Sequence, residues 1–215
     1  MSHVGALLPG PPGMELRLFD VRHMPAAAPQ SGQERLRAAR FLFDRHRHRY
    51  LAGRFALRCI LSDWTGIPAP ALRFAEYGRG KPMLLDRPEI RFNLSYADEN
   101  VLIGVSAKSD LGVDIERRRP FPDARALAED CFDGEEQAAL HATSSARDES
   151  DLFLCGWTRK EAAFKAAALG IVDDPASIAT GIEPAYRELP IGGCLRAGVS
   201  TMVTDRHMIS WAAIL

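Results

Sequence analysis

The sequence predicts an α+β fold in which one unit, a long helix packed on a small and mostly antiparallel sheet, occurs twice. A strand-like segment, a long helical region and several short strand-like segments follow one another in the first half, and a similar order returns in the second. Both long helical regions end in a glycine–isoleucine stop, at Gly66-Ile67 and at Gly170-Ile171. No strong residue-level repeat accompanies this layout, so the similarity of the two lobes is predicted from the order of elements.

Composition allows a sizeable core and argues against several classes of protein. The chain has 215 residues, of which 47% are hydrophobic and 26% charged, and its net charge of −1 creates no global field for nucleic acid or membrane. No apolar run reaches the roughly 18 residues of a spanning helix, and the first residues lack the pattern of a signal peptide. The four cysteines form no C-x-x-C pair. We expect reduced thiols, no zinc site and a cytoplasmic protein.

The first half begins with a strand and a long helical region. Apolar side chains such as Phe41, Tyr50 and Leu57 recur at mixed spacings of three and four residues, which is typical of a helix packed on a core. Glycine and proline then separate shorter segments that alternate or run apolar, as strands do. The expected elements are, in order, a loose lead-in over 1–13, a strand over 14–21, a helical region over 31–63, a short strand over 71–76, a glycine–proline loop over 78–82 and strands over 90–96, 101–106 and 111–116.

The second half begins at the segment Pro120-Phe121-Pro122, because two prolines around one residue interrupt regular structure. We therefore expect an N-terminal lobe over 1–119 and a C-terminal lobe over 120–215. The expected elements of the second lobe are a helical stretch over 123–142, a polar linker over 143–150, a main helix over 151–169 and strands over 178–215.

Two carboxylates interrupt an otherwise apolar strand, Leu-Gly-Val-Asp-Ile-Glu over 111–116. Alternate side chains of a strand point to one side, so Asp114 and Glu116 share a face with roughly 6.5–7 Å between their Cα atoms. Two like charges this close repel, and burying either one unpaired is costly. A Mg²⁺ ion held by both would remove that cost, whereas a solvated polar face of an edge strand would need no ligand.

A third carboxylate lies on the main helix of the second half. At about 100° per residue, Glu161 falls within the apolar arc that contains Trp157 and Phe164. A carboxylate at that position needs a partner. The partner is either Lys165, four residues further along the helix, or a metal ion shared with the two carboxylates of the strand.

The first long helical region is rich in arginine. Guanidinium groups bind phosphate in a bidentate manner, but they also form solvated faces or pair with acids of the same protein. RNA binding lacks support from an aromatic-stacking or glycine-rich signature, and His46 and His48 do not share a helix face that could bind a metal. The arginines are Arg35, Arg37, Arg40, Arg45, Arg47, Arg49, Arg54 and Arg58.

Two short polar segments lie between these regions. The Gly-Arg-Gly-Lys-Pro loop over 78–82 could hold a phosphate through backbone N–H groups and cations, or form a surface turn. The segment Asn93-Leu94-Ser95-Tyr96 offers an amide and two hydroxyl groups at a strand end, which by itself requires no function.

Together, in order and spacing, these segments resemble a known family. The segment G-V-D-I-E, followed about 40 residues later by W-T-R-K-E-A-A-F-K, resembles the paired signature of 4′-phosphopantetheinyl transferases of the larger, two-lobed, surfactin-synthetase-activating type. The upstream segments R-G-K-P, F-N-L-S and R-Y-L-A-G-R-x-x-x-R also fall where that family has matching motifs. The resemblance spans roughly residues 35–170.

This resemblance implies a pseudo-twofold fold with the active site in the cleft between the lobes. It implies transfer of the phosphopantetheine arm of coenzyme A to a serine of an apo acyl or peptidyl carrier protein in fatty-acid, polyketide or nonribosomal peptide biosynthesis. Adenosine 3′,5′-bisphosphate would leave, with Mg²⁺, or alternatively Mn²⁺, as cofactor. We expect a cytoplasmic monomer without nucleic-acid or membrane partners. The rival hypotheses are a non-catalytic regulator that binds coenzyme A or a nucleotide, and an RNA-binding module.

The resemblance also assigns roles to residues. Asp114, Glu116 and Glu161 match the metal ligands, and Lys165 matches a lysine near the diphosphate. Catalytic roles fall to Glu161, Lys165 and Glu116, and the serine proton would pass to Glu161 directly or to a water held by Glu116. The residues expected to contact coenzyme A are Arg49, Arg54, Arg79, Gly80, Lys81, Pro82, Asn93, Ser95, Tyr96, Asp114, Lys160 and Lys165.

One position departs from the family pattern. The family usually has histidine directly after the serine of the N-[IL]-S segment, whereas this chain has Tyr96 after Ser95. Tyrosine can donate one hydrogen bond but adds no positive charge near neutral pH. An arginine of the basic helix is therefore expected to supply the missing charge.

Overall fold

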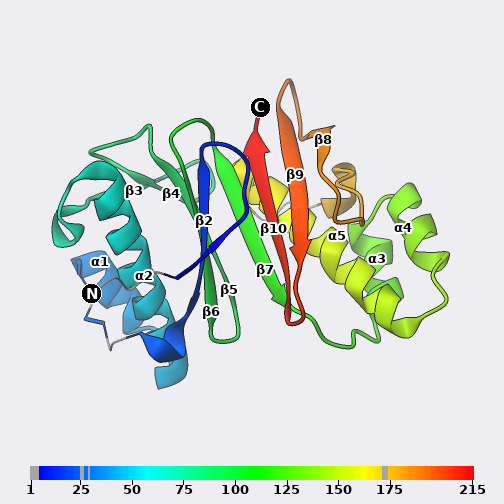
Figure 1. The fold of residues 1–215 in the computed structure, drawn as a ribbon, viewed down its shortest axis with the longest axis horizontal. Coiled ribbons are helices and arrows are strands. Elements are labelled where there is room, and N and C mark those ends of the chain that lie inside the picture. Colours follow the sequence, from blue (N-terminus) through cyan, green and yellow to red (C-terminus); the bar gives the residue numbers. More distant parts are fainter. Residues whose placement is uncertain (1–4, 25–26, 29, 171–173) are drawn as a thin grey trace.

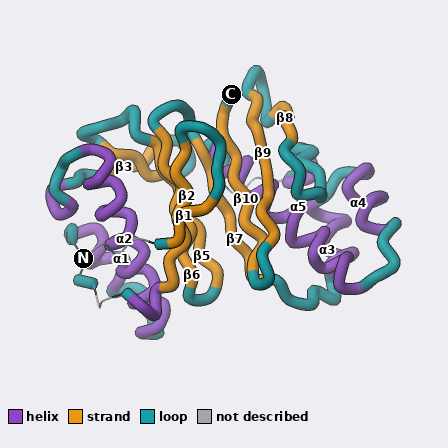
Figure 2. The backbone as a smooth tube through the Cα atoms, viewed as in Figure 1, coloured by secondary structure: helices purple, strands orange, loops and turns teal. Residues whose placement is uncertain are grey.

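A computed structural model describes residues 5–24, 27–28, 30–170 and 174–215 of the chain. Two antiparallel sheets lie side by side at the centre of the molecule, and the helices lie on the outer sides, α1 and α2 beside one sheet and α3, α4 and α5 beside the other (Figure 1). The tube in Figure 2 shows the same helix–sheet–sheet–helix order. This is the expected α+β fold of two similar lobes, each with a long helix on a small sheet.

The first lobe follows the expected order of elements with two additional strands, β1 and β4. The strand β4 begins inside the expected glycine–proline loop over 78–82 and pairs with β3. A short strand, β1, occupies part of the segment expected to be a loose lead-in, because it pairs with β2. The long helical region is interrupted over 39–43 and forms two helices. The elements are β1 (Ala6–Leu8), β2 (Met14–Asp20), α1 (Gly32–Ala38), α2 (Asp44–Thr65), β3 (Phe74–Tyr77), β4 (Lys81–Leu84), β5 (Arg91–Ala97) and β6 (Asn100–Ser106).

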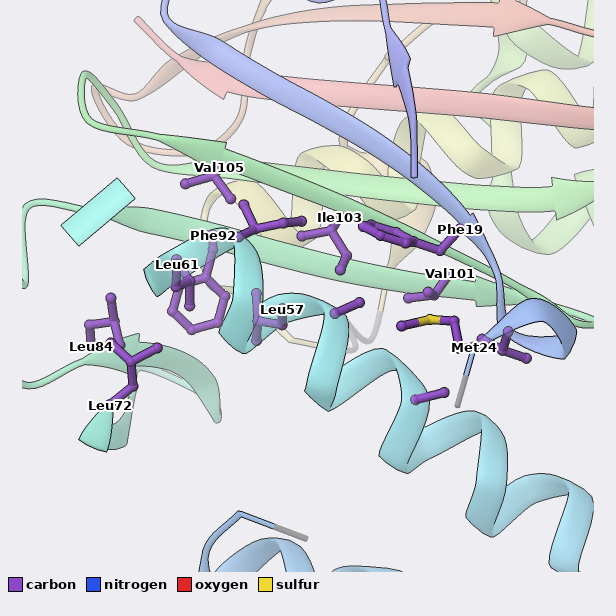
Figure 3. Close-up of a cluster of buried hydrophobic side chains, with 14 of the residues drawn as sticks. Phe19, Met24, Leu57, Leu61, Leu72, Leu84, Phe92, Val101, Ile103 and Val105 are labelled. Atoms are coloured by element: carbon purple, nitrogen blue, oxygen red, sulfur yellow. The ribbon is translucent and has the colours of Figure 1, made fainter. Parts of the chain in front are cut away.

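The helix α2 covers the outer face of the sheet β1-β2-β6-β5. Apolar side chains of the helix, such as Leu57 and Leu61, pack on Phe92, Val101 and Ile103 of the strands (Figure 3). Burying a side chain of this size contributes about 1.5–3 kcal/mol relative to exposure, so this cluster holds the first lobe together. The helix ends at Gly66, whose φ of +71° is the left-handed conformation of a glycine cap.

The second lobe contains a sheet in the order β7-β10-β9-β8. The helical stretch expected over 123–142 forms two short helices, and α5 begins inside the expected polar linker because Ser145 caps it, its Oγ accepting a hydrogen bond from the Asp148 N–H at 3.3 Å. The elements are β7 (Leu111–Arg117), α3 (Ala124–Cys131), α4 (Gly134–His141), α5 (Ala146–Ala166), β8 (Arg187–Pro190), β9 (Arg196–Val203) and β10 (His207–Ile214). Ile171 of the second glycine–isoleucine stop lies outside the described residues.

The strand β7 belongs to the second sheet, where it pairs with β10. The connection between the two sheets is therefore the turn over 107–110, and not the proline-containing segment at the expected boundary of 119 and 120. The proline segment interrupts the chain but separates β7 from α3 within the same lobe. We propose a division of the chain in the 107–110 turn.

An apolar layer joins the two sheets. Leu16 and Leu102 of the first sheet pack against Val113 and Ile209 of the second, and all four are buried. The sheets approach closely at Gly104, where a Cβ atom would lie 2.6 Å from Leu111 Cδ1, so that only glycine fits there without movement.

The strands β5 and β7 meet at the edge of this layer, and we call their contact the lobe seam. The Val113 backbone N–H donates to Asn93 Oδ1 at 3.0 Å, so a side chain joins the two sheets where no strand ladder does.

None of the helices in the described part of the chain combines the length and hydropathy needed to cross a membrane.

Candidate active site

The predicted acidic residues lie where α5 packs on β7. A Cβ atom on Gly112 would collide with the Ala162 carbonyl oxygen and lie 2.5 Å from the Ala166 nitrogen. The missing side chain therefore lets the helix lie directly on the strand. This contact places Glu161 and Lys165 of the helix beside the carboxylate face of the strand. The role of Gly112 was not predicted, although a glycine within an apolar strand is a signal for close backbone approach.

Asp114 is the centre of the cluster. It is 5% exposed, and its Oδ1 accepts from the Lys165 ammonium at 2.6 Å and from the Ser95 hydroxyl at 2.7 Å. Lys165 Nζ also lies 3.7 Å from Glu161 Oε2 and 3.4 Å from Ser95 Oγ. The structure thus brings together residues of β5, β7 and α5, which lie far apart in the sequence. Lys165, four residues along the same helix, is therefore a partner of Glu161, which is one of the two possibilities that the sequence left open.

The two glutamates of the cluster lie in unfavourable surroundings for negative charge. Burial raises the pKa of Glu161, and the charges of Asp114 and Glu116 act in the same direction against the opposing effect of Lys165. Burial also raises the pKa of Glu116, against the effect of Arg119, whose Nη1 lies 3.3 Å from Glu116 Oε2. The three carboxylates therefore attract a further cation.

The donor set fits Mg²⁺ in its chemistry, because three carboxylates offer the oxygen ligands that this ion prefers. Among the described residues, no group of three or more His, Cys, Asp or Glu side chains is arranged to hold a metal ion. The Lys165 ammonium lies between Asp114 and Glu161 instead. This single positive charge does not balance three carboxylates, so the cluster still favours a further cation.

Tyr96 directly follows Ser95 in β5, and its ring packs against α2. The guanidinium carbon of Arg49 lies 5.7 Å from the centre of the Tyr96 ring, within the range of a cation–π interaction. A Cβ atom on Gly53 would lie 2.7 Å from Tyr96 Cε1, so the absent side chain makes room for the ring. Burial raises the pKa of Tyr96 to about 12, which keeps the hydroxyl protonated near neutral pH.

Some of the arginines pair with acids of the same protein, as one of the two interpretations predicted. Arg54 Nε lies 3.1 Å from Glu34 Oε1, and Arg58, which is 1% exposed, donates to the same oxygen at 2.9 Å. Arg54 also lies over the Phe74 ring at 4.4 Å from its centre. These contacts connect α1, α2 and β3. Arg49 differs, since its Nη1 donates to the Asp98 carbonyl and its guanidinium faces Tyr96.

The Gly-Arg-Gly-Lys-Pro segment over 78–82 forms the turn between β3 and β4 and the start of β4, and Asn93 lies in β5. Gly80 has a φ of +88°, which glycine adopts readily, and Lys81 and Pro82 are the first residues of β4. Lys81 is 7% exposed, and its ammonium donates to Asp110 Oδ1 and to the Ala166 carbonyl. Asn93 uses its oxygen in the bond that joins the sheets.

Lys160 lies apart from the cluster, although it is adjacent to Glu161 in the sequence. It is 0% exposed, and its ammonium lies 2.8 Å from Glu136 Oε2 and 2.6 Å from the Ile178 carbonyl oxygen that accepts from it. These contacts are all within the second lobe. We therefore leave Lys160 out of the coenzyme A site proposed below.

The chain resembles known proteins over most of its length. The family model described as the 4′-phosphopantetheinyl transferase superfamily matches residues 110–186, and the model described as 4′-phosphopantetheinyl transferase, N-terminal, matches residues 23–108. The two matches meet at the turn that connects the two sheets.

Individual relatives carry the same description. The 4′-phosphopantetheinyl transferase HetI of a Nostoc strain is 37% identical over 148 residues, which cover 67% of this chain and 62% of the relative. The 4′-phosphopantetheinyl transferases ffp and Sfp of Bacillus subtilis are 31% identical over 142 residues and 27% identical over 141 residues, each covering 66% of this chain and 61% of the relative. The chain thus spans about three fifths of the length of the curated relatives it matches.

Proposed function

Because this chain belongs to the 4′-phosphopantetheinyl transferase superfamily, we propose that it transfers the phosphopantetheine arm of coenzyme A to a serine of an apo acyl or peptidyl carrier protein. Adenosine 3′,5′-bisphosphate is the second product of this reaction. The observation that carries the proposal is the cluster of Ser95, Asp114, Glu161 and Lys165 at the lobe seam, which joins a hydroxyl, two carboxylates and an ammonium from three elements.

Coenzyme A carries a diphosphate and a 3′-phosphate, so its site needs cations and hydrogen-bond donors. We assign the diphosphate to Lys165 and Ser95, and an outer phosphate to Arg49. Arg49 lies against Tyr96, at the position where the family usually has histidine, so it can supply the charge that tyrosine lacks. The proposed contacts also include Arg54, Arg79, Gly80, Pro82, Asn93 and Asp114.

The chemical step is a displacement at phosphorus. The carrier serine Oγ forms a bond to the phosphorus that bears the pantetheine arm, and the bond from that phosphorus to the oxygen of the leaving bisphosphate breaks. Positioning and charge neutralisation dominate such a reaction. The Lys165 ammonium faces the negative charge that develops on the leaving bisphosphate and can donate a proton to it.

The serine proton passes to Glu161 directly, or through a water molecule to Glu116. The raised pKa of each carboxylate makes it a stronger base than an exposed glutamate. When held by Asp114, Glu116 and Glu161, Mg²⁺ or Mn²⁺ supplies further positive charge for the diphosphate oxygens. We also propose that the protein acts as a monomer in the cytoplasm, and size-exclusion chromatography tests the oligomeric state.

A mass-shift assay tests the proposed function. Purified protein is incubated with coenzyme A, Mg²⁺ and apo carrier proteins from fatty-acid, polyketide and peptide synthetases, and each carrier is weighed by mass spectrometry. We expect the mass of the phosphopantetheine arm on at least one carrier. Binding of coenzyme A without a mass shift on any carrier would favour the non-catalytic regulator.

Two substitutions connect the activity to the cluster. We expect Asp114→Ala and Glu161→Ala to lower the transfer rate by about 10²–10³-fold, as the loss of a preorganised charged group does. Asp130→Ala is the matched control, because Asp130 is an exposed carboxylate on α3. Transfer at the unmutated rate by either cluster variant would refute the assignment.

A further inference from the structure

The β3–β4 hairpin of the first lobe packs against the end of α5 in the second. A Cβ atom on Gly78 would lie 3.2 Å from the Ala168 carbonyl oxygen, and one on Gly170 would lie 3.0 Å from Arg79 Cβ. Gly78 and Gly170 both have positive φ, at +56° and +68°. The hairpin turn and the turn that follows α5 are therefore in close contact across the two lobes.

Lys81 lies beneath this contact, and its side chain is 5% exposed. Its ammonium donates to Asp110 Oδ1 at 3.2 Å and to the Ala166 carbonyl oxygen at 3.0 Å. The Tyr77 hydroxyl donates to the same Asp110 oxygen at 2.5 Å. Asp110 itself belongs to the turn that connects the two sheets, and its carbonyl accepts from the Ile214 N–H at 2.9 Å.

These contacts have a physical consequence for α5. Ala166 is the last residue of that helix, and the last carbonyl groups of a helix lack partners within it. A cation at a helix C-terminus satisfies such a carbonyl and interacts favourably with the helix dipole. Lys165, whose ammonium binds Asp114, directly precedes Ala166.

We propose that Lys81 is a positioning residue, which holds the last turn of α5 against the first lobe and thereby sets Lys165 beside Ser95 and Asp114. This role rests on the proposed function and differs from direct binding of a coenzyme A phosphate, the role that the sequence resemblance implied. A side chain this buried, with its donors directed at a carboxylate and a helix terminus, exposes little surface to a substrate phosphate.

Kinetics separate the two roles. Lys81→Met is compared with Lys108→Met, in which an exposed lysine of the same type is lost. We expect Lys81→Met to lower kcat at least tenfold and to leave the KM for coenzyme A within about twofold, since a shift of the catalytic group by a fraction of an ångström slows the reaction. A tenfold rise in the KM for coenzyme A with unchanged kcat, or no change in either, would overturn the proposal.

A second variant separates positioning from stability. Lys81→Met takes the ammonium away from the partly buried Asp110, which keeps Arg91 Nε at 4.0 Å and the Tyr77 hydroxyl, and Asp110→Asn removes the charge that has lost this partner. We therefore expect the double variant Lys81→Met/Asp110→Asn to regain thermal stability relative to Lys81→Met while kcat stays low, because the bond to Ala166 remains lost. Recovery of kcat together with stability would show a purely structural role and refute positioning.

Hydrogen–deuterium exchange gives a readout that does not depend on activity. We expect faster exchange in the last turn of α5 in Lys81→Met, and unchanged exchange there in Lys108→Met. Unchanged exchange in both variants would refute the positioning role of Lys81, whether or not the unmutated chain transfers the arm. A lack of transfer by the unmutated chain to any carrier would refute the proposed function and leave the exchange result as an independent test of positioning.

Discussion

Gly112→Ala tests how closely α5 must approach β7 for activity. The new Cβ atom would lie 2.5 Å from the Ala166 nitrogen and closer still to the Ala162 carbonyl oxygen, whereas real Cβ atoms essentially never approach within 3.0 Å. The helix must therefore retreat from the strand by at least about 0.5 Å at Ala166 and by more at Ala162. The bond of 2.6 Å between Lys165 and Asp114 then lengthens toward the limit of a hydrogen bond.

The size of the effect follows from this retreat. Misplacing a catalytic group by about 1 Å costs about 100-fold in rate, so we expect a loss of between about 10- and 100-fold in kcat. Overpacking also costs about 1–3 kcal/mol of stability, which for a chain of this length lowers Tm by about 2–12 °C. Transfer to carrier protein, followed by mass spectrometry, and differential scanning fluorimetry measure the two effects.

A matched control keeps the interpretation specific. Gly134 is the first residue of α4, and a Cβ atom there would have nothing within 4 Å. We expect Gly134→Ala to leave both rate and Tm close to those of the unmutated chain. If Gly112→Ala transferred the arm as fast as the unmutated chain, the cluster would tolerate displacement of α5, and the geometric basis of the proposed site would be wrong.

Three further predictions follow from the site. We expect Tyr96→His to bind coenzyme A equally well or more tightly by isothermal titration calorimetry, since imidazole matches the residue usual in the family; a large loss of affinity would show a separate role for the tyrosine. We expect exhaustive treatment with EDTA to abolish transfer and added Mg²⁺ to restore it, and undiminished turnover in EDTA would contradict the assigned metal ligands. We expect Glu161→Gln to lose transfer in the presence of Mg²⁺ and to have a higher Tm than the unmutated chain at pH 7 in metal-free buffer. A carboxylate whose pKa is raised by burial loses its stabilising contribution as the pH rises through that pKa, whereas the neutral amide does not ionise. A lower Tm would show that the charge stabilises the fold.

The predicted fold was confirmed where the evidence was local. Segments that alternate or run apolar located the strands β5, β6 and β7, and three- and four-residue spacing located the two long helices. The boundaries were less accurate where capping decided them: α5 begins at Ala146 because Ser145 caps it. The short strand β1 was missed because its only support is its pairing with β2.

For the residues of the site too, local periodicity predicted some positions, whereas others depend on contacts between distant segments. Alternation along β7 placed Asp114 and Glu116 on one face, and the four-residue spacing on α5 placed Glu161 beside Lys165. The partners of Lys81 could not be predicted, because Asp110 and Ala166 reach it only through the packing of the two lobes. The burial of Lys160 against Glu136 had no local signal either.

The sequence by itself determined which side chains share a face and in what order the elements follow, since both depend on the repeat of a single strand or helix. The tertiary structure alone decided which sheet β7 joins, which hydroxyl faces Asp114 and which lysines are buried in structural contacts. The physical reason is that these contacts join segments far apart in the chain. Their distances are set by how closely two packed layers approach, as at Gly104 and Gly112, and no local repeat encodes that distance.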